Sequence, residues 1–358
     1  MTNSLTIAID AMGGDYGPEV VVPAAALALP QIGNGVRFQF YGREDLIRKF
    51  LNSNPSLMSV SDVIHTDKAI SNDEKPSTAL RAGKDSSMRL AIDAVKEGRA
   101  QAVVSAGNTG ALMAMAKMVL KCLPGISRPA IASVFPTRAG DIVMLDLGAN
   151  VSCDAEILTQ FAVLGSVYSR IVKGVATPSV GLLNIGSEDM KGHDEIRAAA
   201  AILSNVKFPG RYHGFVEGDD IPMGTVDVVV TDGFTGNVAL KVAEGVSDLT
   251  SHMLKEAFKS SLLAKLGAIL AYGALKKMKR KMDPRAYNGG MFLGLNGICV
   301  KSHGGMNAYG FSNAILVAAN LVRNDYNSRV AQEIERVMNQ ESFFSASAAA
   351  GDHGGGAV

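Results

Sequence analysis

The sequence contains no tryptophan and only three cysteines, and both shortages restrict what the protein can be. Cys122, Cys153 and Cys299 lie far apart, and none belongs to a Cys-x-x-Cys pair or a Cys/His cluster. Isolated cysteines of this kind are typical of reduced thiols in a cytosolic protein, because a disulfide framework or a zinc site needs closely patterned ligands. We therefore expect neither a disulfide nor a metal site.

Long apolar runs and a signal sequence are also missing. No stretch reaches the roughly 18–20 apolar residues of a membrane-spanning helix, and the first ten residues, MTNSLTIAID, carry no basic segment before their apolar run. We expect a soluble, cytoplasmic protein. The 35 Lys and Arg residues nearly balance 34 Asp and Glu residues, which leaves a formal net charge of +1. That balance argues against a chain-wide polyanion-binding surface, so no nucleic-acid partner is expected.

Two common nucleotide-binding motifs are absent as well. The chain has no GxxxxGK[ST] loop, and its first glycine turn places Gly13, Gly14 and Gly17 at a spacing other than G-x-G-x-x-G. We expect no cofactor. The turn is flanked by Asp10 and Asp15, and a structural turn with capping acids explains these residues as well as a ligand site does.

The residues that are present predict an α/β protein. The chain has 358 residues and is 47% hydrophobic, and short β-type runs alternate with helical patterns along it. Expected strands such as Ala102–Ser105 and Val226–Thr231 are apolar on both faces, as strands covered by helices on both sides must be. This predicts a three-layer α/β/α sandwich with a largely parallel sheet, in which ligands bind at the carboxyl ends of strands. We place the fold in residues 1–338 and expect a disordered tail in residues 339–358, which are rich in Gly, Ala and Ser.

Two expected strand-to-helix turns repeat one pattern. AVVSAGNTGALMA and VVVTDGFTGNVAL share their glycines and threonine at a constant offset of 126 residues, at Gly107, Thr109, Gly110, Gly233, Thr235 and Gly236. Glycine lets the backbone turn sharply, and the N-terminus of the following helix offers free N–H groups and a positive dipole end. Each turn is a candidate anion site, and the two helix ends could face one cleft.

Ser105, Asn108 and Thr109 belong to the first of these turns. Hydroxyl and amide groups around a helix N-terminus suit a phosphate or an oxyanion. Ser105 lacks the G-x-S-x-G context of a nucleophile and has no histidine near it in the sequence. We therefore interpret it as a hydrogen-bond donor and not as a covalent nucleophile.

Three further polar residues are candidates for the chemistry. Lys191 lies near the start of an expected helix, Met190–Leu203, where a purely structural cation would oppose the helix dipole. Its position is easier to explain if it binds an anion. Asn237 follows the second glycine turn, from which its amide could reach a carbonyl or a phosphate. His303 lies between polar and glycine residues in SHGG, where an ordinary polar loop is a simpler explanation than a general base.

A basic amphipathic segment is expected at residues 259–285. Its apolar stripe includes Leu266 and Leu270, and Lys276, Lys277 and Lys279 follow directly. Such a pairing is typical of a helix that lies in an anionic membrane interface, and the stripe is too short to span a bilayer. A core-facing or dimer-forming helix with a solvated basic end explains the same residues equally well.

Seven motifs, in this order and spacing, resemble the bacterial phosphate acyltransferase family, also called acyl-acyl-carrier-protein:phosphate acyltransferase: DAMGGDYGP, SNDEKPSTALR, VVSAGNTGALMA, LDLGANVSC, LLNIGSEDMKG, VVVTDGFTGNVALK and GLNG…KSHG. The resemblance covers about residues 4–338. It implies transfer of a long-chain acyl group from acyl carrier protein to inorganic phosphate, which yields acyl phosphate for phospholipid synthesis. It also implies a fold similar to isopropylmalate dehydrogenase and phosphotransacetylase, a homodimer, and product delivery to a membrane glycerol-3-phosphate acyltransferase.

The resemblance also assigns roles to residues by motif position. Lys191 and Asn237 are placed closest to the reacting groups, and His303 is a weaker catalytic candidate. Phosphate and substrate binding falls to Asp10, Gly13, Gly14, Ser105, Gly107, Asn108, Thr109, Asp232 and Thr235. Because thiolate is a good leaving group, orientation and electrostatics can supply most of the acceleration when phosphate attacks a thioester. Acyl phosphate has a long apolar chain and is used by a membrane enzyme. This favours peripheral membrane association of residues 259–285.

Other classes of protein remain as alternatives. A short-chain phosphotransacetylase would use acyl-CoA, and its chain-length preference would separate it from a long-chain enzyme. A dehydrogenase of the same fold would need a metal-binding acidic cluster, and no suitable Asp-x-x-x-Asp cluster stands out. A non-catalytic membrane scaffold would keep the basic segment but tolerate loss of Lys191.

Overall fold

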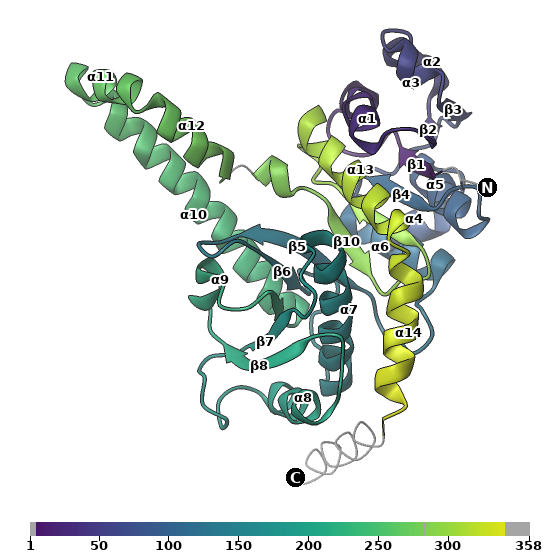
Figure 1. The fold of residues 1–358 in the computed structure, drawn as a ribbon. Coiled ribbons are helices and arrows are strands. Elements are labelled where there is room, and N and C mark those ends of the chain that lie inside the picture. The colour runs from purple at the N-terminus through teal and green to yellow at the C-terminus, as the bar shows by residue number, and fades with distance from the viewer. Residues whose placement is uncertain (1–4, 282–283, 341–358) are drawn as a thin grey trace.

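A computed structural model describes residues 5–281 and 284–340 of the chain (Figure 1). Its centre is a single 11-stranded sheet with the strand order β3-β2-β1-β4-β11-β10-β5-β6-β9-β7-β8. The strands are β1 (Leu5–Asp10), β2 (Val36–Gly42), β3 (Ser61–His65), β4 (Ala102–Ser105), β5 (Ala130–Pro136), β6 (Asp141–Leu145), β7 (Ser179–Leu183), β8 (Arg211–Val216), β9 (Val228–Val230), β10 (Gly290–Leu293) and β11 (Ile298–Lys301).

The sheet consists of two parallel halves. Strands β3, β2, β1, β4 and β11 are mutually parallel and form the first half. Strands β6, β9, β7 and β8 are mutually parallel and form the second half. Between them, β11–β10, β10–β5 and β5–β6 are antiparallel. Since three reversals separate the halves, their strands run in opposite directions across the sheet.

Both faces of the sheet are buried, which explains the apolar runs of its strands. Ile7 and Ile9 pack into one core, whereas Ala8 between them packs into a second core on the opposite face. In the second half, Val228 and Val230 join the first core and Val229 joins a third. This alternation follows from the two-residue period of a strand. The predicted three-layer α/β/α sandwich with a largely parallel sheet is confirmed.

The helices cover the two faces unequally. Helices α1, α7, α13 and α14 share one continuous core, whereas α5 and α6 cover the other face of the first half. The longer helices are α1 (Pro18–Ile32), α2 (Glu44–Leu51), α5 (Ser87–Lys96), α6 (Thr109–Leu120), α7 (Ala155–Lys173), α8 (Asp194–Asn205), α10 (Gly233–Lys259), α11 (Leu262–Leu270), α12 (Tyr272–Lys281), α13 (Ala308–Arg323) and α14 (Tyr326–Met338). Short turns of helix are α3 (Pro55–Met58), α4 (Pro76–Ala82), α9 (Asp220–Met223) and η1 (Pro284–Tyr287).

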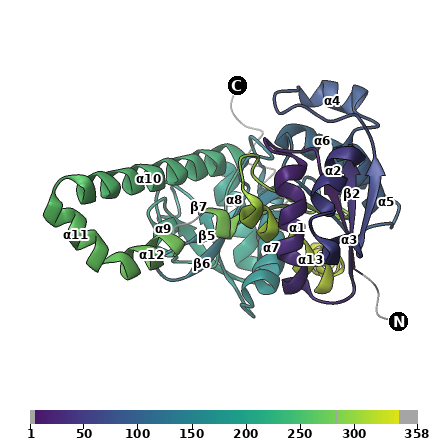
Figure 2. The ribbon, with the colours of Figure 1, turned by 90° about the horizontal axis from the view of Figure 1, so that it is seen from above.

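Helices α10, α11 and α12 form a hairpin that projects away from the sheet in both views (Figures 1 and 2). Only Gly233 and Gly236, in its first turn, are buried residues of α10. Leu266 and Leu270 of α11 are exposed, as are Lys276 and Lys277 of α12. The side chain of Lys279 lies outside the described residues. Within the described ranges, no helix is both long and apolar enough to cross a membrane.

Several boundaries differ from those expected. The helix expected at Met190–Leu203 begins only at Asp194, so Lys191 precedes it and does not oppose its dipole from within the first turn. The helical pattern near the C-terminus forms two helices, α13 and α14, because Asp325 between them adopts a left-handed conformation with φ of 50°. Short polar residues such as Asp tolerate that conformation better than most.

Two strands and part of the tail also depart from expectation. β8 is a partly polar edge strand, and the four residues of β10 lie within a glycine-rich stretch at residues 289–297, so the sequence pattern predicts neither strand. Gln340, assigned to the tail, exchanges two hydrogen bonds with the backbone of Lys207. Residues 341–358 of the expected tail lie outside the described residues.

Candidate active site

Asp10 is the centre of a polar cluster at the carboxyl end of the first half. Its side chain is 1% exposed and accepts hydrogen bonds from the hydroxyls of Ser87 (2.6 Å) and Ser105 (2.7 Å) and from the Met12 N–H (3.3 Å). Burial raises the pKa of Asp10, and these hydrogen bonds oppose that rise. A methyl group at Gly13 would lie 2.6 Å from the Asp10 carboxylate and 2.7 Å from the Gly107 nitrogen. Glycine at position 13 therefore allows two loops to meet over a buried carboxylate.

The turn after β4 is held by its own side chains. Asn108 caps α6 by accepting a hydrogen bond from the Ala111 N–H, at 3.0 Å. Its amide donates to backbone carbonyls of the loop at residues 71–74. The Ser105 hydroxyl is committed to Asp10, whereas Thr109 is exposed and makes no side-chain hydrogen bond among the described residues. Of Ser105, Asn108 and Thr109, it is therefore Thr109 whose side chain is available to bind a ligand.

Asp146 occupies the matching place in the second half, directly after β6. It is fully buried, and its carboxylate accepts backbone N–H bonds from Ile131, Ala149 and Asn150 at 2.9, 3.0 and 2.7 Å. The Asn150 amide adds another at 2.9 Å. Burial raises the pKa of Asp146, although less so because these donors favour the charged form. The turn at Gly233 packs onto this carboxylate, since a methyl group there would lie 2.8 Å from it.

Lys191 lies in the loop that follows β7, and Asn237 lies in the helix that follows the adjacent strand β9. Asn184, at the end of β7, holds this loop by donating to the Lys191 carbonyl at 3.0 Å. Asn237 lies in the second turn of α10, and Gly148 of the loop after β6 lies against it. Both side chains are exposed, and neither has a hydrogen-bond or ion-pair partner among the described residues. They are therefore available to a substrate.

Asp232 and Thr235 support the start of α10. Asp232 is the N-cap and accepts hydrogen bonds from the Thr235 N–H and hydroxyl, both at 2.8 Å. Capping of this kind satisfies a backbone donor that the first helical turn leaves free. Both side chains thus already have a structural role.

The structure separates the expected site residues into two groups. Those of the first half are Asp10, Gly13, Gly14, Ser105, Gly107, Asn108, Thr109 and His303; those of the second are Lys191, Asp232, Thr235 and Asn237. His303 follows β11, and its Nδ1 accepts a hydrogen bond from the Gly305 N–H at 3.2 Å. It therefore lies in the first half, while Lys191 and Asn237 lie in the second. Over residues 5–281 and 284–340, no side-chain hydrogen bond or ion pair joins the two groups.

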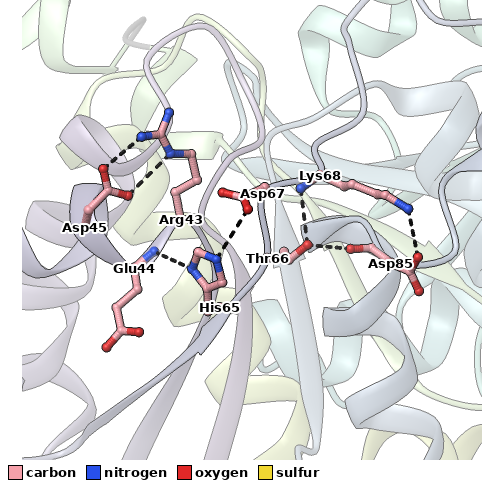
Figure 3. Close-up of polar contacts among 8 residues, drawn as sticks. All are labelled: Arg43, Glu44, Asp45, His65, Thr66, Asp67, Lys68 and Asp85. Atoms are coloured by element: carbon pink, nitrogen blue, oxygen red, sulfur yellow. Dashed lines mark hydrogen bonds and ion pairs between the residues drawn. The ribbon is translucent and has the colours of Figure 1, made fainter.

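A further polar cluster lies at the carboxyl ends of β2 and β3 (Figure 3). Arg43 pairs with Asp45 at 2.8 Å and Lys68 with Asp85 at 2.9 Å, and all four side chains are exposed. His65 accepts a hydrogen bond from the Glu44 N–H. These groups satisfy one another on the surface, so we assign them no part in a substrate site.

The buried end of this cluster nevertheless supports Asp10. Thr66 donates its hydroxyl to the Asp85 carbonyl at 2.6 Å, and the Ser87 N–H donates to the Lys68 carbonyl at 2.9 Å. Ser87 is thereby held where its hydroxyl meets Asp10.

Comparison with known proteins decides the family. The profile of the family described as "Fatty acid synthesis protein" matches residues 5–329. The phosphate acyltransferase of Rhodospirillum centenum is 58% identical over 337 residues, which cover 94% of this chain and 95% of that protein. This chain belongs to the phosphate acyltransferase family. The phosphate acyltransferase of Paramagnetospirillum magneticum is 54% identical over 341 residues, with 95% and 97% coverage. The chain is thus an acyltransferase enzyme.

Solved structures agree on the fold. A phosphotransacetylase from Streptococcus pyogenes matches with a TM-score of 0.59 at 17% identity, covering 90% of this chain and 95% of that one. The EutD phosphotransacetylase from Staphylococcus aureus matches with a TM-score of 0.58 at 16% identity, covering 89% and 94%. At such identities the likeness establishes architecture alone, and it confirms the phosphotransacetylase-like fold.

The sequence shows a polar, glycine-containing turn at residues 146–150 after an expected strand, but neither Asp146 nor Lys301 is among the expected site residues. Asp146 carried a usable signal, because an Asp directly after an apolar strand and before a glycine turn repeats the arrangement at Asp10. Lys301 carried a weaker one, a single charge at the end of the apolar run ICVK.

Proposed function

We propose that this acyltransferase moves a long-chain acyl group from acyl carrier protein to inorganic phosphate and releases acyl phosphate for phospholipid synthesis. The observation that supports this most directly is the pair Lys191 and Asn237. Both are exposed and unpaired in the described structure, in the segments that follow adjacent parallel strands. A lysine and an amide so placed suit a phosphate and the oxygen of a thioester carbonyl.

The chemistry we propose is direct attack by phosphate. A phosphate oxygen forms a bond to the thioester carbonyl carbon, and the resulting oxyanion collapses with cleavage of the carbon–sulfur bond. The carrier thiolate leaves with that electron pair and is protonated by solvent. Lys191 offsets the negative charge of phosphate, and the Asn237 amide donates to the developing oxyanion. On the first-half side, the exposed Thr109 hydroxyl is the free donor toward phosphate. Ser105 and Asn108 hold the turn that presents it, with Asp10, Gly13 and Gly14 packed beneath that turn.

A covalent acyl-enzyme is not required by this proposal. Ser105 is fully buried and donates its hydroxyl to Asp10. Burial raises the pKa of the Cys153 thiol to about 12, and it raises the pKa of Cys299 further. Neither thiol is a ready nucleophile at neutral pH, because the thiolate is the reactive form. Mass spectrometry of enzyme quenched during turnover should therefore show no acyl adduct, and a stoichiometric adduct would overturn direct attack.

Turnover with defined substrates tests the function itself. Wild-type protein incubated with palmitoyl-carrier protein and phosphate should release free carrier protein and acyl phosphate in equal amounts. Matched reactions with palmitoyl-CoA and with acetyl-CoA separate the proposed donor from the short-chain phosphotransacetylase alternative. Faster reaction with acetyl-CoA, or release of carrier protein without phosphate, would contradict the proposal.

We also propose a homodimer formed along α10. Val238, Val242, Val246, Leu249 and Met253 recur at helical spacing on this projecting helix and are 47–62% exposed. Large apolar stripes of this kind mark interaction surfaces. A second copy of the chain would bury the stripe. Val246→Glu should give a monomer in analytical ultracentrifugation, and a monomeric wild type would refute the dimer.

The last part of the proposal is peripheral membrane association through the tip of the hairpin. Leu262, Leu266 and Leu270 are 54–83% exposed there, beside the exposed cations Lys276 and Lys277. Apolar anchors next to basic side chains favour an anionic bilayer surface, with about 1 kcal/mol per basic residue near it. Such placement would hand acyl phosphate to a membrane glycerol-3-phosphate acyltransferase.

Vesicle co-sedimentation tests the membrane contact. Wild type should sediment with anionic vesicles at low salt and be released by high salt. Leu266→Glu, or charge reversal at Lys276 and Lys277, should abolish sedimentation and spare soluble turnover. Lys241→Glu, on the paired and exposed Lys241 of α10, is the control for charge alone. Wild type that stays in the supernatant with anionic vesicles would end this part of the proposal.

A further inference from the structure

Lys301 is a partly buried lysine at the end of β11, the strand of the first half that borders β10. It lies beside Ser105 of β4 in the parallel pairing of these strands. Its Nζ donates to the Ala106 carbonyl at 3.2 Å and to the Ser302 carbonyl. Both partners are backbone oxygens, and Lys301 makes no ion pair within the described part of the chain. A cation removed from water and given only neutral partners needs an explanation.

Three loops of the first half meet above this lysine. A methyl group at Gly14 would lie 2.9 Å from the Ala106 side chain and 3.0 Å from the Gly304 carbonyl. The Asp15 N–H donates to that same carbonyl at 3.0 Å. The loops after β1, β4 and β11 are therefore in contact, and Lys301 holds the peptide through which β4 enters the turn at residues 107–109.

The ionisable groups around Lys301 are acidic or neutral. Asp10 of β1 and Asp15 of the loop after it attract its charge, and Cys299 is the other titratable group of β11 that acts on it. Burial raises the pKa of Cys299, so it stays a neutral thiol. Loss of water around Lys301 lowers its pKa to about 8 despite the two carboxylates. Near neutral pH its cation offsets part of their negative charge.

We propose that Lys301 is a positioning residue for phosphate binding, which fixes the Ala106 peptide and offsets the charge of Asp10 and Asp15 beneath the turn at residues 105–109. The inference rests on the proposed function in taking phosphate as the acyl acceptor. Without the cation, two carboxylates would repel an incoming dianion. Lys301 itself acts through the turn and need not touch the ligand.

The test compares Lys301→Met and Lys301→Arg with a matched control, Lys173→Met. Lys173 is also a partly buried lysine, but it pairs with Asp227 at 2.9 Å between α7 and the start of β9. We expect Lys301→Met to raise the phosphate KM about 10-fold or more, as loss of a nearby charge should, and to change the KM for the acyl donor less than about 2-fold. Lys301→Arg should recover part of the loss because the charge is kept. Lys173→Met should lower Tm and leave the phosphate KM unchanged.

The pH dependence separates this role from a purely structural one. Since the protonated lysine is the effective form, the wild-type phosphate KM should rise as pH increases through about 8. Over that interval inorganic phosphate only becomes more fully the dianion, so its own ionisation would not raise the KM. The rise should vanish in Lys301→Arg, because the guanidinium keeps its proton there.

Whereas phosphate affinity should fall as pH rises through about 8, the contribution of Lys301 to stability should improve over the same rise. Folding lowers the pKa of Lys301, so its charged form opposes stability below pH 8, and that cost disappears at higher pH. Below pH 8, Lys301→Met should therefore unfold at a Tm no lower than that of wild type, although it loses phosphate affinity.

Three outcomes would overturn the inference: an unchanged phosphate KM in folded Lys301→Met, an equal rise in Lys173→Met, or a flat wild-type pH profile. Calorimetric titration with inorganic phosphate tests the inference without turnover. If wild type transfers no acyl group to phosphate, the proposed function fails; Lys301 then stands if phosphate binds wild type but not Lys301→Met. If phosphate does not bind wild type, or binds wild type and Lys301→Met equally well, the inference about Lys301 is rejected.

Discussion

The two halves of the sheet carry the same arrangement of residues with different partners. In each half, a buried Asp lies at the end of one strand or directly after it, and the neighbouring strand leads into a Gly-x-Thr-Gly turn. Asp10 and the turn after β4 form one pair, and Asp146 and the turn after β9 form the other. In each half a third strand lies next to the one that leads into the turn. In the first half this is β11, which ends in Lys301, and in the second it is β7, which Lys191 follows in the next loop.

The difference lies in what the polar groups bind. In the first half, Asp10 is held largely by hydroxyls, and Lys301 is bonded to carbonyls. In the second half, Asp146 is held by fixed N–H donors, and Lys191 is exposed and unpaired in the described structure. Two halves with the same arrangement of residues thus differ in that the lysine of the first is bonded within the fold and the lysine of the second is exposed.

Removing the free groups of the second half should have the largest effect. Lys191→Ala and Asn237→Ala should each lower turnover by about two to three orders of magnitude, because preorganised charge and hydrogen-bond donors are lost. Steady-state kinetics with palmitoyl-carrier protein measures the effect, and circular dichroism checks the fold. Lys241→Ala, on the same projecting helix as Asn237, is the matched control and should keep wild-type turnover. Wild-type turnover in either folded site variant would exclude that residue from the site.

Replacing the buried carboxylate of each half should reduce the free energy of unfolding by different amounts. Asp146→Asn places an NH₂ group against backbone N–H groups, which cannot become hydrogen-bond acceptors. It should therefore reduce the free energy of unfolding by about 3 kcal/mol. Asp10→Asn should cost less than about 1 kcal/mol, because the hydroxyls of Ser87 and Ser105 can rotate to accept from the amide. Urea unfolding measures both. Equal losses would show that the partners of the carboxylate do not matter.

The pH dependence sharpens the same contrast. Burial raises the pKa of Asp10, so the folded protein still holds this proton where the unfolded chain has lost it. Stability from this group falls as pH rises from the ordinary carboxyl pKa through the raised one. The side chain in Asp10→Asn does not titrate, so the free energy of unfolding of this variant should increase relative to that of wild type over that interval. Urea unfolding in a series from about pH 4 to pH 8 checks the sign.

Substitution of matching glycines should have a smaller effect. A methyl group at Gly236 would overlap the Asp146 carbonyl oxygen, whereas one at Gly110 would meet only the Pro76 side chain at 2.8 Å. Gly236→Ala should therefore destabilise by about 2–3 kcal/mol. Gly110→Ala should change stability by less than about 1 kcal/mol, since helix propensity offsets the contact. A reversed order in thermal unfolding would argue against the different packing of the two turns.

The surface cluster of the first half should have the smallest effect. Lys68→Ala removes an exposed ion pair with Asp85 but leaves the backbone bonds that hold Ser87. We expect no measurable change in Tm or turnover, because exposed pairs contribute little. A clear loss of turnover would connect this cluster to the Asp10 site.

Local features of the fold could be predicted from the sequence, and long-range ones could not. Strands β4 and β11 begin and end where their apolar runs do, and the turns at Gly107 and Gly233 follow from their motifs. That β11 pairs with β4, nearly 200 residues away, has no local signal. The opposite direction of the two halves depends on β10, whose short apolar run lies within a glycine-rich stretch that does not mark it as a strand.

The same limit applies to the site. Lys191 was predicted from its motif and charge, but its place before α8 depends on where that helix begins. The bond from Lys301 to Ala106 joins residues 195 positions apart, so only the folded chain brings it about.

The order of the strands has a consequence for synthesis on the ribosome. β6, β7, β8 and β9 are all made by residue 230, whereas β11 arrives only at residues 298–301. The half that begins at the N-terminus is therefore completed last: until β11 emerges, β4 has an unpaired edge, and α1 lacks the cover of α13. An unpaired parallel strand is a site for wrong association. Nascent chains halted in the α10–α12 hairpin carry that open edge, and synthesis through residue 301 closes it and delivers Lys301 beneath the turn at residues 105–109.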